Sequence, residues 1–272
     1  MTGLIEPQFN SKGKLTLTPA ALIFSTGNVK SEIRRDRIIA VSVGDERVEK
    51  GGMPARVGRD LIPFGGGLGV AAVANKSVDL LTIEFRDERA AYHGAVFILP
   101  ATQASPIKQQ LDATIKVPPV ADPAPCTDRT THPNTLLIEP IGSNGVVLPA
   151  EYRILFYERL TEELEKLRED DWLYRFGDID AGAGCTALTL SFSVNDFKRG
   201  NEALRASTGF VGYFLGATSA KFHIKLTDRS GKILEEKDLK QKKGGEVESL
   251  DLAREVAGQV SDHVKKASRS KS

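Results

Sequence analysis

The sequence predicts an α+β protein in which a small, bent antiparallel β-barrel with a capping helix is followed by an α/β two-layer sandwich. Three observations point to this fold class. Short apolar runs with a two-residue period fill the first third of the chain, a proline-rich stretch follows them, and strands then alternate with two long helical patterns. The 272 residues are 40% hydrophobic and 27% charged, which is typical of a globular protein with real cores.

The proline-rich stretch predicts the domain boundary. Residues 117–133 contain five of the 13 prolines and few large apolar side chains, so they can neither pair in a sheet nor fill a core. The expected organisation is a first domain at 13–116, a linker at 117–133, a second domain at 134–267 and a basic, disordered tail at 268–272. We expect cleavage within the linker to release two independently folded domains.

Six strands and one helix are expected in the first domain. The predicted strands are 14–18, 21–25, 29–34, 38–44, 79–85 and 94–99. Around the fifth strand, Leu81, Ile83 and Phe85 alternate with Leu80, Thr82 and Glu84, which predicts a sheet with one buried face. Ser105 and Pro106 then provide an N-cap and a first helical position for a helix that reaches residue 115.

The second domain is expected to begin with a strand and a helix, continue with further strands and end with a second helix. Its strands are predicted at 135–139, 172–176, 186–197, 220–227 and 232–239. A helix that begins at Pro149 carries an apolar stripe and is expected to pack by one face only, while Glu162, Glu163 and Glu165 form surface ion pairs. The turn Asp228-Arg229-Ser230-Gly231 predicts a hairpin, and four-residue apolar spacing predicts a last helix over 249–266.

Both halves resemble known bacterial families. The segments GKLTLTPAALIFST (13–26), IIAVSVG (38–44) and DLLTIEFRD (79–87), in that order before a helix, resemble the pleckstrin-homology-like (PH-like) superfold, and more narrowly its GRAM-like members. The helix LFYERLTEELEKL, the strand TALTLSFSVNDFKRGN, the stretch TGFVGYFLGATSA and the hairpin KLTDRSGKILEE resemble a lipoprotein-associated domain of unknown function, related to the N-terminal domains of TolB and the curli secretion lipoprotein. These resemblances imply a largely non-enzymatic protein.

Charge and cysteine content bound the partners and the compartment. Lys and Arg number 37 against 36 Asp and Glu, so no overall field attracts nucleic acid, and no nucleic-acid partner is expected. The N-terminal residues show neither the apolar core of a signal peptide nor the lipobox cysteine of the lipoprotein members. Cys126 and Cys185 are expected to be free thiols in a reducing compartment, with one long-range disulfide as the alternative. The expected location is therefore cytoplasmic, with peripheral attachment at the inner membrane.

Motifs for catalysis and for cofactors fail on their chemistry. Gly65, Gly67 and Gly69 are not followed by the Gly-Lys-Ser/Thr of a phosphate-binding loop. Asp178 and Asp180 begin like a calcium loop, but glycine and threonine occupy later ligand positions, which favours a solvated turn. The histidines, His93, His132, His223 and His263, show no metal spacing. We therefore expect no enzyme, no cofactor and no metal.

Two uncharged, glycine-rich segments, 61–75 and 206–220, are the candidate binding site. They are either buried core or an exposed apolar surface, and basic residues flank them. On the second interpretation, the lipid- or partner-binding residues are Arg56, Arg59, Leu61, Phe64, Leu68, Lys76, Phe210, Tyr213 and Phe214. The predicted function is then a binding or scaffolding protein recruited to an anionic membrane surface or a protein complex. The alternative is a homo-oligomeric structural subunit that self-assembles through its α/β domain.

Overall fold

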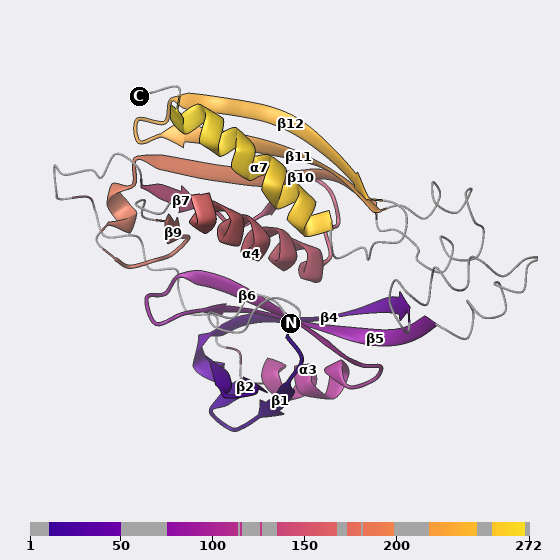
Figure 1. Ribbon diagram of the computed structural model, residues 1–272. Coiled ribbons are helices and arrows are strands. Elements are labelled where there is room, and N and C mark those ends of the chain that lie inside the picture. The colour runs from indigo at the N-terminus through magenta and orange to yellow at the C-terminus, as the bar shows by residue number, and fades with distance from the viewer. Residues whose placement is uncertain are drawn as a thin grey trace, which may run out of the picture.

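The protein is described by a computed structural model over residues 11–49, 75–113, 115, 126, 135–167, 173–180, 182–198, 218–243 and 252–269 (Figure 1). It is a mixed α+β fold. The N-terminal half contains β1 (Lys14–Leu17), β2 (Ala21–Thr26), β3 (Val29–Arg34), the 3₁₀ turn η1 (Arg35–Arg37), β4 (Ile38–Glu49), β5 (Asn75–Arg86), β6 (Tyr92–Pro100) and α3 (Ala104–Asp112). The C-terminal half contains β7 (Leu136–Ile138), β8 (Gly142–Ser143), α4 (Ala150–Leu167), β9 (Leu173–Arg175), the 3₁₀ turn η2 (Ala183–Cys185), β10 (Leu188–Lys198), β11 (Thr218–Asp228), β12 (Ile233–Lys243) and α7 (Leu252–Arg269).

The predicted barrel is wrong in its closure. The described N-terminal strands form two separate antiparallel sheets, β1-β2-β3 and β4-β5-β6, and no closed barrel. The two sheets and α3 enclose one apolar cluster that includes Leu22, Ile33, Leu81, Phe97 and Leu111. The β4–β5 hairpin extends beyond the predicted strands, because its antiparallel register continues to the pair Glu49 and Asn75.

The C-terminal sheet has the order β12-β11-β10-β7-β9, and β8 pairs with β10. The β10–β11–β12 part is antiparallel, whereas β7 runs parallel to both β10 and β9. The predicted hairpin turn is confirmed: Asp228 Oδ1 accepts hydrogen bonds from the N–H groups of Ser230 and Lys232, and Gly231 has the left-handed φ of 83°. The last helix, α7, continues to Arg269, three residues beyond its predicted end at residue 266.

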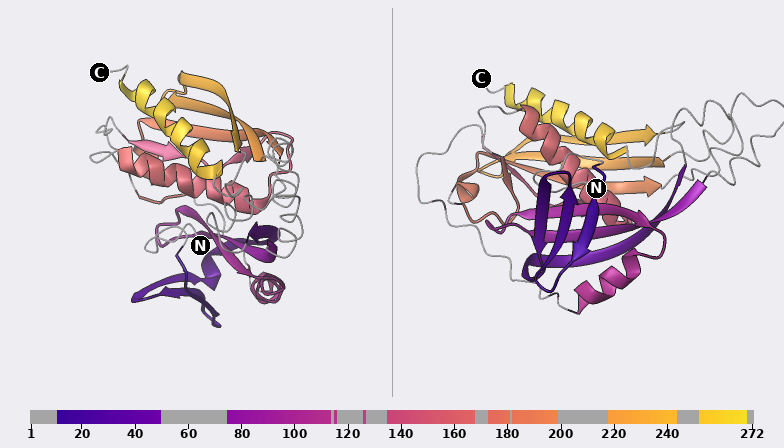
Figure 2. Two further views of the ribbon diagram at one scale, coloured as in Figure 1. Left: turned by 45° about the vertical axis from the view of Figure 1, so that its right-hand side comes forward. Right: turned by 60° about the horizontal axis from the view of Figure 1, so that its bottom comes forward.

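α4 lies between the two halves, so the prediction that it packs by one face is wrong. Together with α7 it covers one face of the C-terminal sheet, and it also lies against the β4–β6 sheet (Figures 1 and 2). Two neighbouring residues show both contacts. The ring of Phe156 lies 6.3 Å from that of Phe192 on β10, and the ring of Tyr157 lies 5.0 Å from that of Tyr92 on β6.

This arrangement buries both faces of the β4–β6 sheet, where one buried face was expected. Leu81 and Ile83 belong to the N-terminal cluster, whereas Val78, Leu80 and Val96 belong to a larger cluster that continues into α4, α7 and the C-terminal sheet. Thr82 and Glu84 are therefore buried as well. The polar alternation marks a helix-covered face rather than a solvated one, because Arg153 of α4 pairs with Glu84. The buried Thr82 hydroxyl has no hydrogen-bond partner among the described residues.

Candidate functional site

Most of the predicted binding residues lie outside the described residues. Arg56, Arg59, Leu61, Phe64 and Leu68 fall between β4 and β5, and Phe210, Tyr213 and Phe214 fall between β10 and β11. Lys76 is on β5, where its backbone pairs with Val48 of β4. What the structure does give is the position of the strand ends that these two segments connect.

Both glycine-rich segments connect strands that end at the same end of the molecule. The connection that contains the first segment leaves β4 at Glu49 and enters β5 at Asn75, and these two residues are directly paired. The second lies between Lys198 of β10 and Thr218 of β11, and Lys198 pairs with Ser219. These strand termini lie at the same end of the molecule, on the right in Figure 1 and in the right-hand view of Figure 2. We call this the loop end.

The start of α4 ties the two sheets together at the loop end. A Cβ atom placed on Gly44 of β4 would lie 2.8 Å from Oε1 of Glu151, in the first turn of α4. Just before α4, Asn144 donates hydrogen bonds to Ser193 Oγ and Asn195 Oδ1, near the end of β10. The chain therefore passes from the β10 end to the β4 strand within eight residues.

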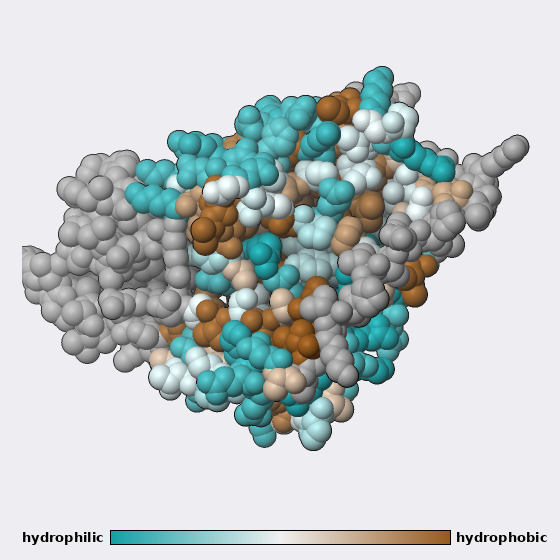
Figure 3. Space-filling view, turned by 180° about the vertical axis from the view of Figure 1, so that it is seen from behind, coloured by the Kyte–Doolittle hydropathy of each residue, from teal (hydrophilic) through white to brown (hydrophobic). Residues whose placement is uncertain are grey.

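Basic side chains gather on the C-terminal strands at the loop end. Seen from behind, the upper part of the molecule, where this sheet lies, is largely hydrophilic (Figure 3). The register places Lys198 opposite Ser219, Lys221 opposite Lys240, and Lys242 opposite Ser219 on its other side. All four lysines are exposed, and Lys221 forms a 2.9 Å ion pair with Asp196. These residues were missed in the sequence, although the run Lys240-Gln-Lys-Lys243 signals them.

A buried polar cluster joins the two halves on the β4–β6 face of α4. Glu84 of β5 is only 7% exposed and accepts hydrogen bonds from the Tyr92 hydroxyl, at 2.7 Å, and from the Arg153 guanidinium of α4. Burial, together with the charge of Glu84, raises the pKa of Tyr92. Tyr92 is therefore a neutral donor to a carboxylate that is also paired with an arginine.

A second ion pair lies one helical turn further along α4. Glu158 is 4% exposed, and both of its carboxylate oxygens accept hydrogen bonds from Arg175 of β9 at 3.0 Å. One of them also accepts the backbone N–H of Gly94 on β6 at 2.8 Å. Burial lowers the pKa of Arg175, but the neighbouring acidic groups, with Glu158 the largest contributor, together outweigh burial and the pKa is raised. The sequence does contain a signal for a buried polar face on α4. Glu151 and Glu158, which are both buried, are seven residues apart and therefore lie on one face of the helix.

Each of these buried carboxylates is thus held by a guanidinium, so the cluster is suited to positioning the halves rather than to proton transfer. Within the described residues, no group of three or more His, Cys, Asp and Glu side chains could hold a metal ion.

Asp178 is not a solvated turn residue as expected. It is 1% exposed, accepts the N–H of Asp180, and lies 3.4 Å from Arg89 of the N-terminal half.

Three histidines are satisfied within the structure. His93 is buried, stacks on Phe85 and contacts Asp87 at 3.3 Å. His223 contacts Asp238 at 2.9 Å and Glu236 at 3.1 Å, and His263 contacts Glu235 at 3.3 Å. His132 lies outside the described residues.

Among the helices that the structure describes, none is long and apolar enough to cross a membrane.

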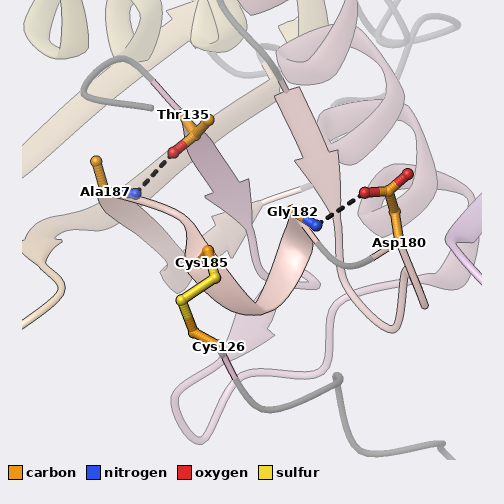
Figure 4. Close-up of a disulfide and its surroundings, with 6 residues drawn as sticks. All are labelled: Cys126, Thr135, Asp180, Gly182, Cys185 and Ala187. Atoms are coloured by element: carbon orange, nitrogen blue, oxygen red, sulfur yellow. Dashed lines mark hydrogen bonds between the residues drawn. A yellow bond between two sulfur atoms is a disulfide. The ribbon is translucent and has the colours of Figure 1, made fainter. Parts of the chain in front are cut away.

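The two cysteines form a disulfide, which corrects the expectation of free thiols (Figure 4). Cys126 comes from the linker and Cys185 from η2, 59 positions later in the chain. Local hydrogen bonds hold the loop around Cys185: the N–H of Ala187 donates to Thr135 Oγ1, and the N–H of Gly182 donates to Asp180 Oδ1, both at 2.8 Å. The linker is therefore attached to the C-terminal half, a pairing that cysteine spacing alone could not reveal.

No family model matches the chain, and no curated protein matches it. Similar solved structures include the PelC dodecamer of Paraburkholderia phytofirmans, with a TM-score of 0.35 and 12% identity over 52% of this chain and 91% of that one. A substituted form of that PelC dodecamer gives a TM-score of 0.33 and 13% identity over 47% and 84%. A Xanthomonas campestris protein of the DUF330 family, a domain of unknown function, gives 0.25 and 8% over 53% and 90%. Similarity at this level carries no argument about activity.

Proposed function

We propose that this protein is a non-enzymatic binding protein that attaches to an anionic membrane surface through its loop end. The observation that carries the proposal is the placement of the strand ends, because the two uncharged, glycine-rich segments depart from one end of the molecule. Two apolar segments on one end can contact the same flat surface together. In this proposal the N-terminal half serves as a PH-like module, and the C-terminal half supports the second segment.

The charges at the loop end support an anionic partner. Lys198, Lys240 and Lys242 are exposed on the strands that frame the second segment. In the sequence, Arg56, Arg59 and Lys76 flank the first segment. Basic residues near a membrane each contribute about 1 kcal/mol of attraction to anionic lipid. Combined with apolar side chains at the interface, this gives reversible attachment.

The buried charges support the non-enzymatic part of the proposal. Glu84 and Glu158 have the burial expected of catalytic carboxylates, but Arg153 and Arg175 neutralise them and α4 covers them. Their geometry is explained by the contact between the two halves. Substitution of either carboxylate is expected to affect stability rather than any turnover.

The disulfide favours an oxidising compartment over the expected cytoplasmic one. Disulfides persist in secreted, periplasmic and cell-surface proteins, whereas cytosolic thiols are kept reduced. Cys126 and Cys185 are bonded here. We therefore propose that the membrane surface contacted by the loop end faces such a compartment.

Vesicle flotation tests the proposal. Wild-type protein is expected to float with vesicles of phosphatidylglycerol and phosphatidylcholine, and to float less as salt is raised. The double variant Phe64→Ser/Leu68→Ser should lose at least about a hundred-fold in affinity, since each apolar side chain contributes roughly 1.5 to 3 kcal/mol when buried. Its melting temperature should stay close to that of the wild type.

A matched control comes from the other end of the molecule. Ile179 is a 51% exposed apolar residue that follows β9. Its N–H donates to the carbonyl of Arg89, in the β5–β6 turn at the opposite end of β5 from Asn75, so Ile179→Ser removes exposed apolar area away from the loop end. This variant should float like the wild type. Failure of the wild type to bind vesicles, or equal losses in both variants, would contradict membrane attachment and leave a protein partner for the loop end. A large fall in melting temperature of the Phe64/Leu68 variant would mean that the segment is core.

Self-assembly through the C-terminal half is the second candidate function, and one observation favours it. β12 is a sheet edge of 11 residues, and among the described strands it pairs only with β11. A long edge strand offers unpaired backbone N–H and C=O groups to a second strand. Sedimentation velocity over a range of protein concentrations tests this function.

A further inference from the structure

We propose that β12 pairs antiparallel with β12 of a second copy, in a register centred on Leu239, so that two C-terminal sheets join into one. This inference rests on the second candidate function and identifies its interface. It starts from the regularity of the strand. From Glu235 to Lys243, β12 pairs with β11 without interruption, and the single irregularity lies before Glu235. These nine regular positions have Leu239 at their centre.

The register with β11 assigns the side chains to the two faces of the sheet. Glu236, Asp238, Lys240 and Lys242 are opposite Lys225, His223, Lys221 and Ser219, on the face that the helices do not cover. Leu239 and Gln241 are opposite Phe222 and Ala220, on the helix-covered face. The hydrogen bond from Gln259 of α7 to Gln241 confirms this second assignment.

The charges on the uncovered face are divided along the strand. Its acidic members, Glu236 and Asp238, precede Leu239, and its basic members, Lys240 and Lys242, follow it. All four are exposed, and Asp238 is 79% exposed. In a two-fold antiparallel pair, the first half of one strand lies beside the second half of the other. The acidic half of each strand would therefore face the basic half of its partner.

Only one register satisfies the charges. With the two-fold axis at Leu239, Asp238 is opposite Lys240 of the second copy, Glu236 is opposite its Lys242, and the two Leu239 side chains meet on the axis. An axis at Asp238 would place the two Asp238 carboxylates opposite each other, and an axis at Lys240 would do the same to the two Lys240 ammonium groups. An axis at Lys237 would place Glu236 opposite Asp238. Like charges directly opposite destabilise a strand pair, whereas opposite charges stabilise it.

Charged residues on an edge strand commonly serve to prevent pairing. A strand protected by lysines alone would place like charges together in any antiparallel pairing with a second copy. β12 differs, because the register that its regular length favours is also the register in which all four charges on the uncovered face are complementary. The charge pattern therefore selects a second copy of this chain as the partner.

Charge exchange tests the register. Lys240→Asp places a carboxylate opposite Asp238 of the partner, and Asp238→Lys places an ammonium group opposite Lys240. Each single variant changes two symmetry-related pairs, so its dimer dissociation constant should rise about ten-fold or more in sedimentation velocity. The double variant Asp238→Lys/Lys240→Asp restores both pairs and should dimerise like the wild type. An equimolar mixture of the two single variants should form a heterodimer, because its pairs are again complementary.

A control and a second readout keep the outcomes separate. Asp262→Lys makes the same change of charge on the exposed side of α7 and should leave the dimer unaffected. Circular dichroism of each variant shows whether it is folded, and the mixture requires both single variants to be folded. A wild type that stays monomeric would overturn both self-assembly and this interface. An oligomer that neither single variant weakens, or that the mixture fails to restore, would overturn this interface and leave self-assembly standing.

Discussion

The carboxylate of Glu158 on α4 accepts the backbone N–H of Gly94 on β6 at 2.8 Å, 64 positions away in the chain. A helix of the C-terminal half thus completes the hydrogen bonding of a strand in the N-terminal half. The same carboxylate is paired with Arg175 of β9, so three elements meet at one buried charge. Breaking this charge should therefore affect both halves together.

Replacement of Glu158 is the first prediction. Glu158→Gln leaves Arg175 buried beside a neutral group, and removal of one partner of a buried ion pair costs about 3 to 5 kcal/mol. We expect a loss of that size in the free energy of unfolding measured in urea. Glu163→Gln is the control, since Glu163 pairs with the 56% exposed Lys166 and should change stability by less than about 1 kcal/mol. Equal, small losses in both variants would show that the Glu158 pair does not hold the halves together.

The close approach of α4 to β6 gives the second prediction. A Cβ atom on Gly94 would lie 2.4 Å from the side chain of Ile154, so Gly94→Ala should destabilise the protein by about 1 to 3 kcal/mol through overpacking. Gly258 of α7 has nothing within 4 Å of such an atom, and Gly258→Ala should stabilise its helix by about 1 kcal/mol. Thermal unfolding of the two variants should shift in opposite directions. A double-mutant cycle with Ile154→Ala should show that Gly94→Ala costs less once Ile154 is shortened.

Reduction of the disulfide gives the third prediction. A closed loop with a sequence separation of 59 contributes roughly 4 kcal/mol in the chain-entropy model, so dithiothreitol should lower the melting temperature of the wild type. The variant Cys126→Ser/Cys185→Ser should melt at the lower temperature and should not respond to dithiothreitol. Thiol titration in denaturant, before and after reduction, checks the bond itself. Two titratable thiols in freshly purified, unreduced protein would contradict the disulfide.

Cleavage of the linker is the fourth prediction. The sequence alone suggests that the halves fold independently, but α4 shares its apolar cluster with Leu80 and Val96 of the N-terminal sheet. We expect that a protease site placed before Cys126 yields two fragments that co-elute in size-exclusion chromatography, because separation would expose that shared core. Fragments that elute apart, each with cooperative unfolding, would support independent domains instead.

Local features of the fold could be predicted from the sequence, whereas contacts between distant segments could not. The β11–β12 hairpin was predictable because Asp228 and Gly231 form the turn by themselves. The helical pattern of α4 was equally visible, but its burial on both sides depends on the β4–β6 sheet, which lies on the other side of the linker. A polar alternation such as Thr82 and Glu84 cannot distinguish water from a helix that carries Arg153.

The candidate site likewise combines features that the sequence predicts with contacts that only the fold creates. The uncharged, glycine-rich segments are easily recognised in the sequence. No local feature, however, indicates that β4, which ends at Glu49, and β10, which ends at Lys198, end on the same side of the molecule. The lysine cluster and the disulfide also depend on tertiary structure. Lys221 and Lys240 become neighbours through strand register, and the Cys126–Cys185 bond depends on the position of η2.

Tryptophan quenching by brominated lipids tests most directly whether both glycine-rich segments contact one membrane surface. The chain has a single tryptophan, Trp172, which directly precedes β9 in the sequence, so Phe64→Trp and Phe214→Trp can each be made with Trp172→Phe. We predict that vesicles with brominated acyl chains quench both variants and leave wild-type Trp172 fluorescence unchanged. Quenching of only one of the two variants, or of neither, would contradict a shared contact surface at the loop end.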